Sequence, residues 1–281
     1  MEPFVFFVVL VSAACHAALN CALKAAPDPL AASIMLAVGG GVAATPVLIL
    51  TGAPPLAAAP FLAASVFIHI FYWSFLGKAY ASGSVSVVFP LARGIAPVLV
   101  MFVAVFLFNE HMSGSQWAAV ACILGGIYII LASGYDVNAF RSNPMPLNVM
   151  AVALSVMGYT LVDGYGARAT GSPLAYVVFL YVANGWVLLA YGLTRHRRRL
   201  MAAVDQGWLP GLLSGGTSLA IYAAAVWAMT KAPIPLVAAL REASVLFAVA
   251  LAMLWLKEPF RVGRIMGAGV IAAGLAYARL A

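Results

Sequence analysis

Charged residues are scarce in this 281-residue sequence, where Lys, Arg, Asp and Glu together make up 8% of the chain. A water-soluble domain carries about 25% charged residues, so this composition excludes a hydrated surface of the usual kind. The three cysteines, Cys15, Cys21 and Cys122, lie in or beside apolar segments without the spacing of a metal site. We interpret them as packing residues rather than as ligands or disulfide partners.

Motifs for catalysis are also missing. The sequence contains no HExxH motif, no paired intramembrane aspartates and no recognisable Ser/His/Asp set. A phosphate-binding loop is absent as well. We therefore predict a protein that is not an enzyme, has no catalytic residues, metal or cofactor, and draws any driving force from gradients or exchange.

Hydrophobic residues account for 65% of the chain and fall largely into runs of about 20, the length that crosses roughly 30 Å of hydrocarbon. The runs lack an alternating pattern, and backbone groups in lipid must be paired internally, so the spans are predicted as helices. The first run, within MEPFVFFVVLVSAACHAAL, is preceded by Glu2 and by no basic residue, and it extends beyond any plausible cleavage site. We predict that it is the first span and not a signal peptide.

Glycine, proline and polar breaks divide the sequence into ten predicted spans. They are 4–23, 30–50, 56–80, 84–108, 114–134, 146–166, 173–193, 208–230, 233–256 and 262–280. A polar linker, GYDVNAFRSNPMP, separates the fifth from the sixth. The predicted fold is all-α and integral to the membrane, with a first five-helix repeat at 1–138 and a second at 145–281. An odd number of spans per repeat places the two in opposite orientations.

Three polar or glycine landmarks recur at one offset of 148 residues (241 − 93). The pairs are Arg93 with Arg241, Glu110 with Glu258, and Gly126 with Gly274. The intervening segments align without a gap, which supports an internal duplication. A charge inside an apolar span disfavours insertion by about 2.5–3.5 kcal/mol, so the two arginines indicate a functional site between the halves.

Basic loop residues predict the orientation. One set of alternate loops contains Lys24, Arg141, Arg195, Arg197, Arg198, Arg199, Lys257, Arg261 and Arg264, whereas the other side has Arg168, Lys231 and Arg279. The positive-inside rule then puts both termini outside the cytoplasm. We interpret the RHRRR cluster as an orientation anchor, with binding of anionic lipid as the alternative. We expect a multi-pass protein of the cell inner membrane.

The ten spans, the 5+5 repeat, and the segments FLFNEHMSGSQWAAVACILGGIYIILA and LWLKEPFRVGRIMGAGVIAAGLAYA resemble the EamA type of the drug/metabolite transporter superfamily. The matching positions are Asn109-Glu110 and Lys257-Glu258-Pro259. The resemblance implies a transporter of small organic metabolites, often an exporter, with a central cavity lined by both halves. The chain departs from the usual member in placing its basic cluster after the seventh span. Either its orientation is reversed or the charge rule does not apply.

Arg93 and Arg241 are the first candidates for substrate binding. Pro90 and Pro97 flank Arg93, and the backbone that they open is expected to face protein or a cavity. Two guanidinium groups facing a cavity would hold a carboxylate, phosphate or phosphonate bidentately. The alternative is a structural ion pair with Glu242 or Asp163, or an arginine that extends to the interface.

Further candidates come from polar and aromatic residues inside the spans. Asp163 ends the predicted sixth span, near Tyr159, and is assigned either to a substrate ammonium group or proton relay, or to the headgroup zone. The third span presents an aromatic stripe that would wall a cavity or face lipid. Glu242, like Asp163, would meet a positive group of the substrate or a coupling proton. The remaining members of the predicted site are His16, Asn20, His69, Tyr72, Trp73, Tyr80 and Tyr222. Glu110, Glu258 and Arg168 are predicted as loop or interface residues.

The sequence thus predicts a secondary transporter that moves a small anionic or zwitterionic metabolite, such as an amino acid or aminophosphonate, by alternating access. A non-transporting membrane scaffold or sensor with the same repeat is the alternative. The expected partners are a small-molecule substrate and membrane lipids, with no nucleic acid, and the chain is expected to be a monomer or homodimer.

Overall fold

The computed structural model describes residues 1–24, 26–82, 85–134, 145–247, 250 and 262–280. Within these ranges the chain forms helices joined by turns and contains no strand, which confirms the all-α prediction. Glu258, the second member of the predicted glutamate pair, lies outside the described residues together with its neighbours Lys257 and Pro259.

The helices follow the predicted spans closely. Those of the first half are α1 (Pro3–Lys24), α2 (Pro29–Thr51), the short 3₁₀ helix η1 (Leu56–Ala58), α3 (Ala59–Ser82), α4 (Val85–Phe106) and α5 (Gly114–Gly134). Those of the second half are α7 (Met145–Thr170), α8 (Pro173–Arg195), α9 (Arg197–Gln206), α10 (Leu209–Met229), α11 (Ile234–Arg241) and α13 (Val262–Leu280).

Helix starts are set by local chemistry. Asp28 caps α2, and its Oδ1 accepts hydrogen bonds from the backbone N–H groups of Leu30 and Ala31, both at 3.1 Å. Before α5, Ser113 Oγ accepts from the N–H of Gln116 at 3.3 Å, and Gln116 Oε1 accepts from the N–H of Ser113 at 3.0 Å. This reciprocal capping box satisfies donors that have no partner within the helix.

Six of the described helical segments are long and apolar enough to cross a membrane, and three further apolar stretches are shorter. The six are Pro3–Leu23, Leu30–Thr51, Leu56–Leu76, Pro146–Thr170, Pro173–Arg195 and Leu209–Met229. Large apolar side chains such as Phe4, Leu50 and Leu56 are exposed on them. A chain of this kind buries its apolar exterior in lipid, and it is a multi-pass membrane protein.

Three local features differ from the sequence prediction. The RHRRR segment does not form a simple loop, because residues from Arg197 to Gln206 form the separate helix α9. The predicted ninth span is interrupted after Arg241 by a turn at Glu242 and Ala243. The sixth span continues to Thr170, so Asp163 lies within α7 rather than at its end.

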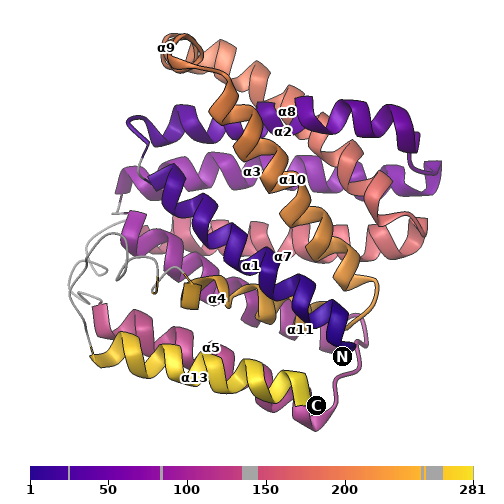
Figure 1. The fold of residues 1–281 in the computed structure, drawn as a ribbon, viewed down its shortest axis with the longest axis vertical. Coiled ribbons are helices and arrows are strands. Elements are labelled where there is room, and N and C mark those ends of the chain that lie inside the picture. Colours follow the sequence, from indigo (N-terminus) through magenta and orange to yellow (C-terminus); the bar gives the residue numbers. More distant parts are fainter. Residues whose placement is uncertain (25, 83–84, 135–144, 248–249, 251–261, 281) are drawn as a thin grey trace.

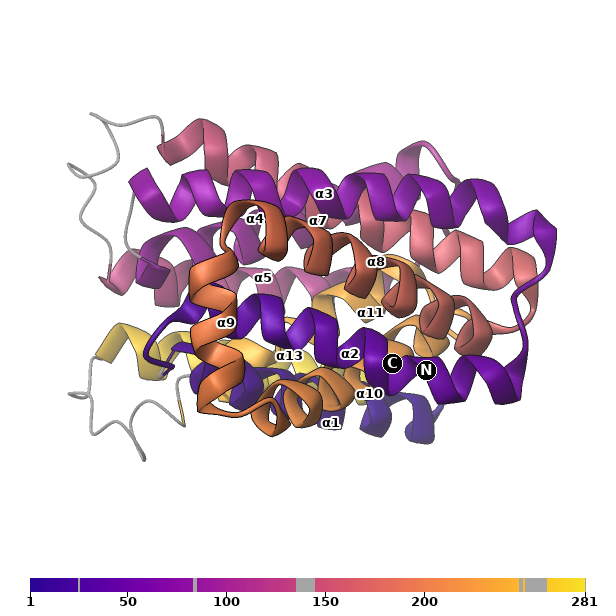
Figure 2. The ribbon, with the colours of Figure 1, turned by 90° about the horizontal axis from the view of Figure 1, so that it is seen from above.

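Helices α2, α3 and α7 run in similar directions, and α1, α8 and α10 cross them obliquely (Figure 1). The two termini lie close together, toward one end of the bundle (Figures 1 and 2). Helices α5 and α13, the last of each half, lie side by side along one edge (Figure 1). Helix α9 runs across the direction of the long helices, near the end where α1 stops and α2 begins (Figure 2). We call this the α9 end, and the other the terminal end.

Contacts between α5 and α13 reproduce the repeat offset. A Cβ added to Gly126 would lie 2.6 Å from Cγ1 of Ile271, and one added to Gly274 would lie 3.0 Å from Cγ1 of Ile123. Gly126 and Gly274 are 148 residues apart, and so are Ile123 and Ile271. Each contact is therefore the repeat equivalent of the other, as expected when two copies meet across a pseudo-two-fold axis.

Candidate functional site

Arg93 and Arg241, the symmetric arginines, lie in the middle of the protein and not at a lipid-facing surface. Arg93 is in the interior of α4 and is 8% exposed. Arg241 is the last residue of α11, which has the buried segment Ile234–Leu240 behind it. Both arginines line the same cavity. Neither is extended toward the membrane interface.

Glu242, which follows Arg241 in the sequence, is the partner of Arg93. Its carboxylate forms an ion pair with Arg93, with 3.3 Å between Oε2 and Nε. Glu242, Arg93 and Arg241 also line a small recess of about 10 Å³ between α4, α7 and α11. The ion pair that the sequence offered as an alternative role for Arg93 therefore exists, but Arg93 lines the cavity at the same time.

Arg241 differs from Arg93 in its surroundings. Among the described residues, no carboxylate oxygen lies within 4.0 Å of its guanidinium group. Its charge faces the ring of Tyr222, with 5.5 Å from Cζ to the ring centroid. This cation–π contact orients the guanidinium group but leaves its N–H donors without an anionic acceptor in the described part of the protein.

The cavity has a volume of about 180 Å³ and is formed by helices of both halves. A water molecule occupies about 30 Å³ in the liquid, so the space admits a small organic molecule rather than a single ion. Its lining is His16, Asn20, Leu36, Ala37, His69, Tyr72, Trp73, Arg93, Tyr159, Leu180, Tyr181, Asn184, Leu188, Ser218, Ile221, Tyr222 and Arg241.

Asp163 anchors a buried hydrogen-bond network beside the cavity. It is 0% exposed, and its Oδ1 accepts a hydrogen bond from the hydroxyl of Tyr176 at 2.9 Å. Its Oδ2 accepts another from the hydroxyl of Tyr222. Tyr222 lines the cavity and Asp163 does not. The Asp163 carboxylate is therefore linked to the cavity wall through its hydrogen bond with Tyr222.

Aromatic rings form one wall of the cavity. His69 stacks on Tyr159 with 4.6 Å between ring centroids, and Tyr72 meets Tyr159 edge-on at 5.9 Å. Nδ1 of His69 lies 2.8 Å from the backbone oxygen of Ser65, which fixes the ring on α3. Trp73 continues the wall, with 5.2 Å between its ring and that of Tyr72. His69, Tyr72, Trp73 and Tyr159 all line the cavity.

Most of the predicted site residues therefore come together around one space. His16, Asn20, His69, Tyr72, Trp73, Arg93, Tyr159, Tyr222 and Arg241 line the cavity. Glu242 lines the adjoining recess, and Asp163 lies behind Tyr222. The side chain of Tyr80 is outside the described part of the structure. The described residues contain no cluster of His, Cys, Asp or Glu suited to a metal ion.

Three polar lining residues were missed by the sequence interpretation. The hydroxyl of Tyr181 donates to the backbone oxygen of Ser218 at 2.9 Å, and Asn184 follows one turn later on α8. Asn184 is the lone amide in the apolar stretch FLYVANGWVLL, and an isolated polar residue of this kind is the signal that would have identified it. Ser218 lies in the less distinctive SGGTSLAIY.

The lining residues lie toward the α9 end. His16 and Asn20 are in the second half of α1, and Leu36 and Ala37 are in the first half of α2. At the terminal end, Arg168 of α7 forms an ion pair with Glu110, which precedes α5. Arg168 also donates to the backbone oxygens of Met229 at 2.7 Å and Ala232 at 3.0 Å. Glu110 thus binds an arginine of the other half rather than capping the next helix.

Comparison with known proteins identifies a family and a fold. The model of the EamA-like transporter family matches the chain twice, over residues 3–132 and 144–280. No curated protein matches. Solved structures do match, among them a crystal structure with a TM-score of 0.75 and 16% identity that covers 100% of this chain and 99% of its own. At this identity the likeness establishes the fold alone. From the two family matches, which span nearly all of it, we conclude that the chain belongs to the EamA-like transporter family.

Proposed function

We propose that the protein is a secondary transporter that carries a small anionic or zwitterionic organic molecule through the cavity. The observation that supports this most strongly is Arg241, whose charge faces the cavity with no described carboxylate within 4.0 Å. A charge at this depth in a membrane protein is retained where function requires it. An anionic group on a substrate supplies the acceptors that the guanidinium group lacks.

In this proposal Arg241 and Arg93 have different roles in substrate binding. Arg241 binds the carboxylate or phosphonate of the substrate with two parallel hydrogen bonds. Arg93, held by Glu242, contributes positive charge and a second donor surface. Glu242 then meets either an ammonium group on the substrate or a coupling proton. Amino acids and aminophosphonates have both charges, and they are the substrate classes that we propose.

Alternating access is supported by unequal packing of equivalent helix pairs. The repeat relates α2 to α8 and α3 to α10, so contact of α2 with α10 is equivalent to contact of α8 with α3. The first pair is close, with Gly39 against Gly211 and Gly40 against Gly215, whereas α8 and α3 meet at fewer points. Exchange of these two arrangements would loosen the α2–α10 contact and tighten the α3–α8 contact, as alternating access between inverted repeats requires.

At the terminal end, the Glu110–Arg168 ion pair would act as a latch that holds the two halves together. It joins the first half to the second half, and two backbone carbonyls of the α10–α11 connection share the same guanidinium group. Opening the terminal end requires these contacts to break together. Gradients of protons or exchange for a second substrate would supply the energy.

A ligand screen on purified protein tests the binding proposal. A ligand that binds the folded state raises the apparent melting temperature, and the rise grows with the logarithm of its concentration relative to Kd. We expect amino acids, phosphonates or small carboxylates to stabilise the wild type and not Arg241→Gln, while the exposed Arg279→Gln at the terminal end responds like the wild type. If no compound in these classes stabilises the protein, or if Arg241→Gln responds fully, the arginine is structural and the scaffold or sensor function is favoured.

We also propose that the α9 end faces the cytoplasm of the cell inner membrane and that both termini lie outside. The support is the concentration of arginines at α9. In a variant without its native cysteines, a cysteine at position 197 should resist a membrane-impermeant maleimide in intact cells, and a cysteine placed at Lys231 should react. The reverse pattern would invert the orientation.

A further inference from the structure

Helix α9 is a distinct amphipathic element, and its position in the fold is independent of what the cavity binds. It joins α8 to α10 and runs across the long helices near one end of the bundle (Figure 2). Leu200 is buried against Gly192 of α8 and Ile34 of α2, which fixes the inner face of α9 on the bundle. An amphipathic helix held across the end of a membrane-spanning bundle lies in the plane of the interface.

The outer side of α9 is strongly basic. Four arginines occupy five positions, and all four are exposed: Arg195, Arg197, Arg198 and Arg199. Two carboxylates belong to this region, Asp205 on α9 and Asp28 at the start of α2. Asp28 Oδ2 lies 3.8 Å from Arg199 Nε, and in the described part of the chain it is the one carboxylate within 4.0 Å of these four residues.

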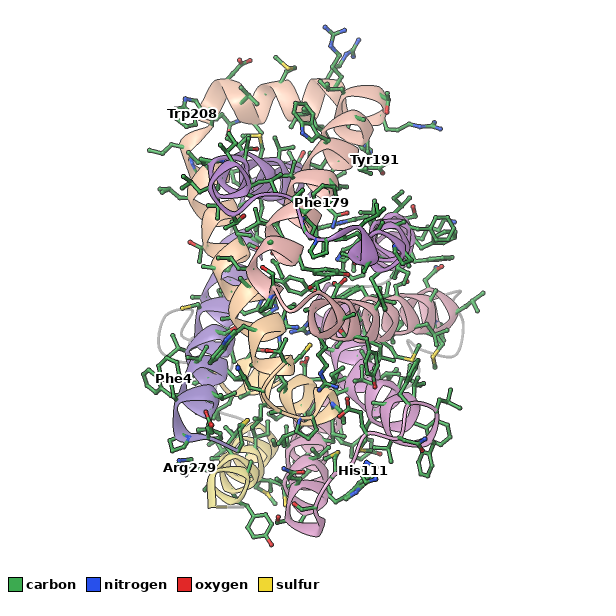
Figure 3. The ribbon with its side chains drawn as sticks, turned by 90° about the vertical axis from the view of Figure 1, so that its right-hand side faces the viewer. Phe4, His111, Phe179, Tyr191, Trp208 and Arg279 are labelled. Carbon is green, nitrogen blue, oxygen red and sulfur yellow. The ribbon has the colours of Figure 1, made fainter. Side chains whose placement is uncertain are left out.

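Apolar and aromatic side chains flank the arginines. Met201 and Val204 of α9 are exposed, and Trp208, just beyond its end, is 61% exposed. Figure 3 shows Trp208 and Tyr191 on opposite sides of the end of the molecule where α9 lies. Tryptophan and tyrosine favour the level of the lipid headgroups, where their rings are apolar and their N–H and O–H groups are hydrated.

We propose that α9 is a binding site for anionic lipid, in which the headgroup phosphate meets Arg197 and Arg198 and the acyl chains contact Met201, Val204 and Trp208. The combination of excess positive charge and exposed apolar surface on one interfacial helix fits a phospholipid and not a soluble anion, which would need no apolar contact. Because α9 connects α8 with α10, a bound lipid would also restrain the two helices that hold Asn184 and Ser218 in the cavity wall.

Quenching of Trp208 by brominated lipids tests this site in the full-length protein. Fluorescence is measured with brominated phosphatidylglycerol and brominated phosphatidylcholine in mixed micelles, and subtraction of the Trp208→Phe signal isolates Trp208. We expect half-maximal quenching at a much lower fraction of phosphatidylglycerol than of phosphatidylcholine. Each arginine near an anionic surface contributes about fivefold in affinity, so replacing Arg197 and Arg198 with glutamine should weaken the preference by at least tenfold.

The control is the double variant Lys231→Gln and Arg279→Gln, which removes the same charge at the terminal end and should quench like the wild type. Equal quenching of the wild type by the two lipids would overturn the proposal, and this comparison does not depend on any variant folding. An unchanged lipid preference in the arginine variant would also overturn it. Inorganic phosphate in excess should not displace the lipid, and full displacement would assign the site to a free anion.

Discussion

The contact of α5 with α13 offers a prediction with a control one residue away. Gly126 and Gly125 are neighbours on α5, but a Cβ on Gly126 would lie 2.5 Å from the oxygen of Gly267 and 2.9 Å from the nitrogen of Ile271. A Cβ on Gly125 would meet nothing within 4 Å. Substitution by alanine therefore adds the same methyl group, and the same gain in helix propensity, to a closed position and to an open one.

The expected magnitude follows from these distances. Non-bonded heavy atoms pack best at about 3.5–4.0 Å. Two of the three atoms nearest to a Cβ on Gly126 belong to the backbone, which cannot rotate away as a side chain can. The helices must separate by roughly 1 Å, and overpacking of this kind lowers the free energy of unfolding by about 1–3 kcal/mol. The alanine at 125 should be neutral or stabilising by up to about 1 kcal/mol.

Thermal unfolding of the purified protein measures the difference. At about 2 °C per kcal/mol for a chain of this size, Gly126→Ala should melt several degrees below Gly125→Ala. Gly267→Ala should behave like Gly126→Ala, since the contact is reciprocal. The double variant should lose less than the sum of the two, because one separation of the helices relieves both contacts. Equal melting temperatures for Gly126→Ala and Gly125→Ala would refute the close approach of α5 and α13.

Two further predictions concern buried charges. Arg168→Gln should lower the melting temperature and raise the accessibility of the terminal end to a small thiol reagent. Glu110→Gln should have smaller effects, because Arg168 keeps its hydrogen bonds to Met229 and Ala232. Equal accessibility in the wild type and Arg168→Gln would contradict the latch. Asp163→Asn weakens the hydrogen bonds that the Tyr176 and Tyr222 hydroxyls donate to a charged acceptor, each contributing about 1.5–3 kcal/mol. We therefore expect a clear loss of thermal stability. An unchanged melting curve would contradict the buried network.

The spans were predictable from the sequence because each needs about 20 apolar residues, and Gly114–Gly134 was predicted to the residue. Helix α9 was not, since its arginines resemble a loop until the neighbouring Leu200 is seen to be buried. The break after Arg241 was missed because the sequence there has neither glycine nor proline. The prolines around Arg93 lie within α4, which is helical from Val85 to Phe106.

The site was predictable where one residue carries the signal. A charge in an apolar span identified Arg93 and Arg241, and the aromatic pattern of the third span identified Tyr72. Contacts between residues far apart in the sequence could not be predicted without the fold. Arg168 pairs with Glu110, 58 positions away, and Asp163 accepts hydrogen bonds from Tyr176 and Tyr222. The first contact depends on how the two halves pack together, and the other two depend on how α7, α8 and α10 of the second half pack.

Substrate exchange in proteoliposomes tests the central claim, that Arg241 binds an anionic substrate in a cavity open to alternating sides. Vesicles loaded with a ligand from the stability screen should accumulate the labelled compound from outside when they contain wild-type protein or Arg279→Gln. Arg241→Gln, folded and inserted to the same extent as the wild type, should lose this accumulation. Full exchange by Arg241→Gln would contradict it.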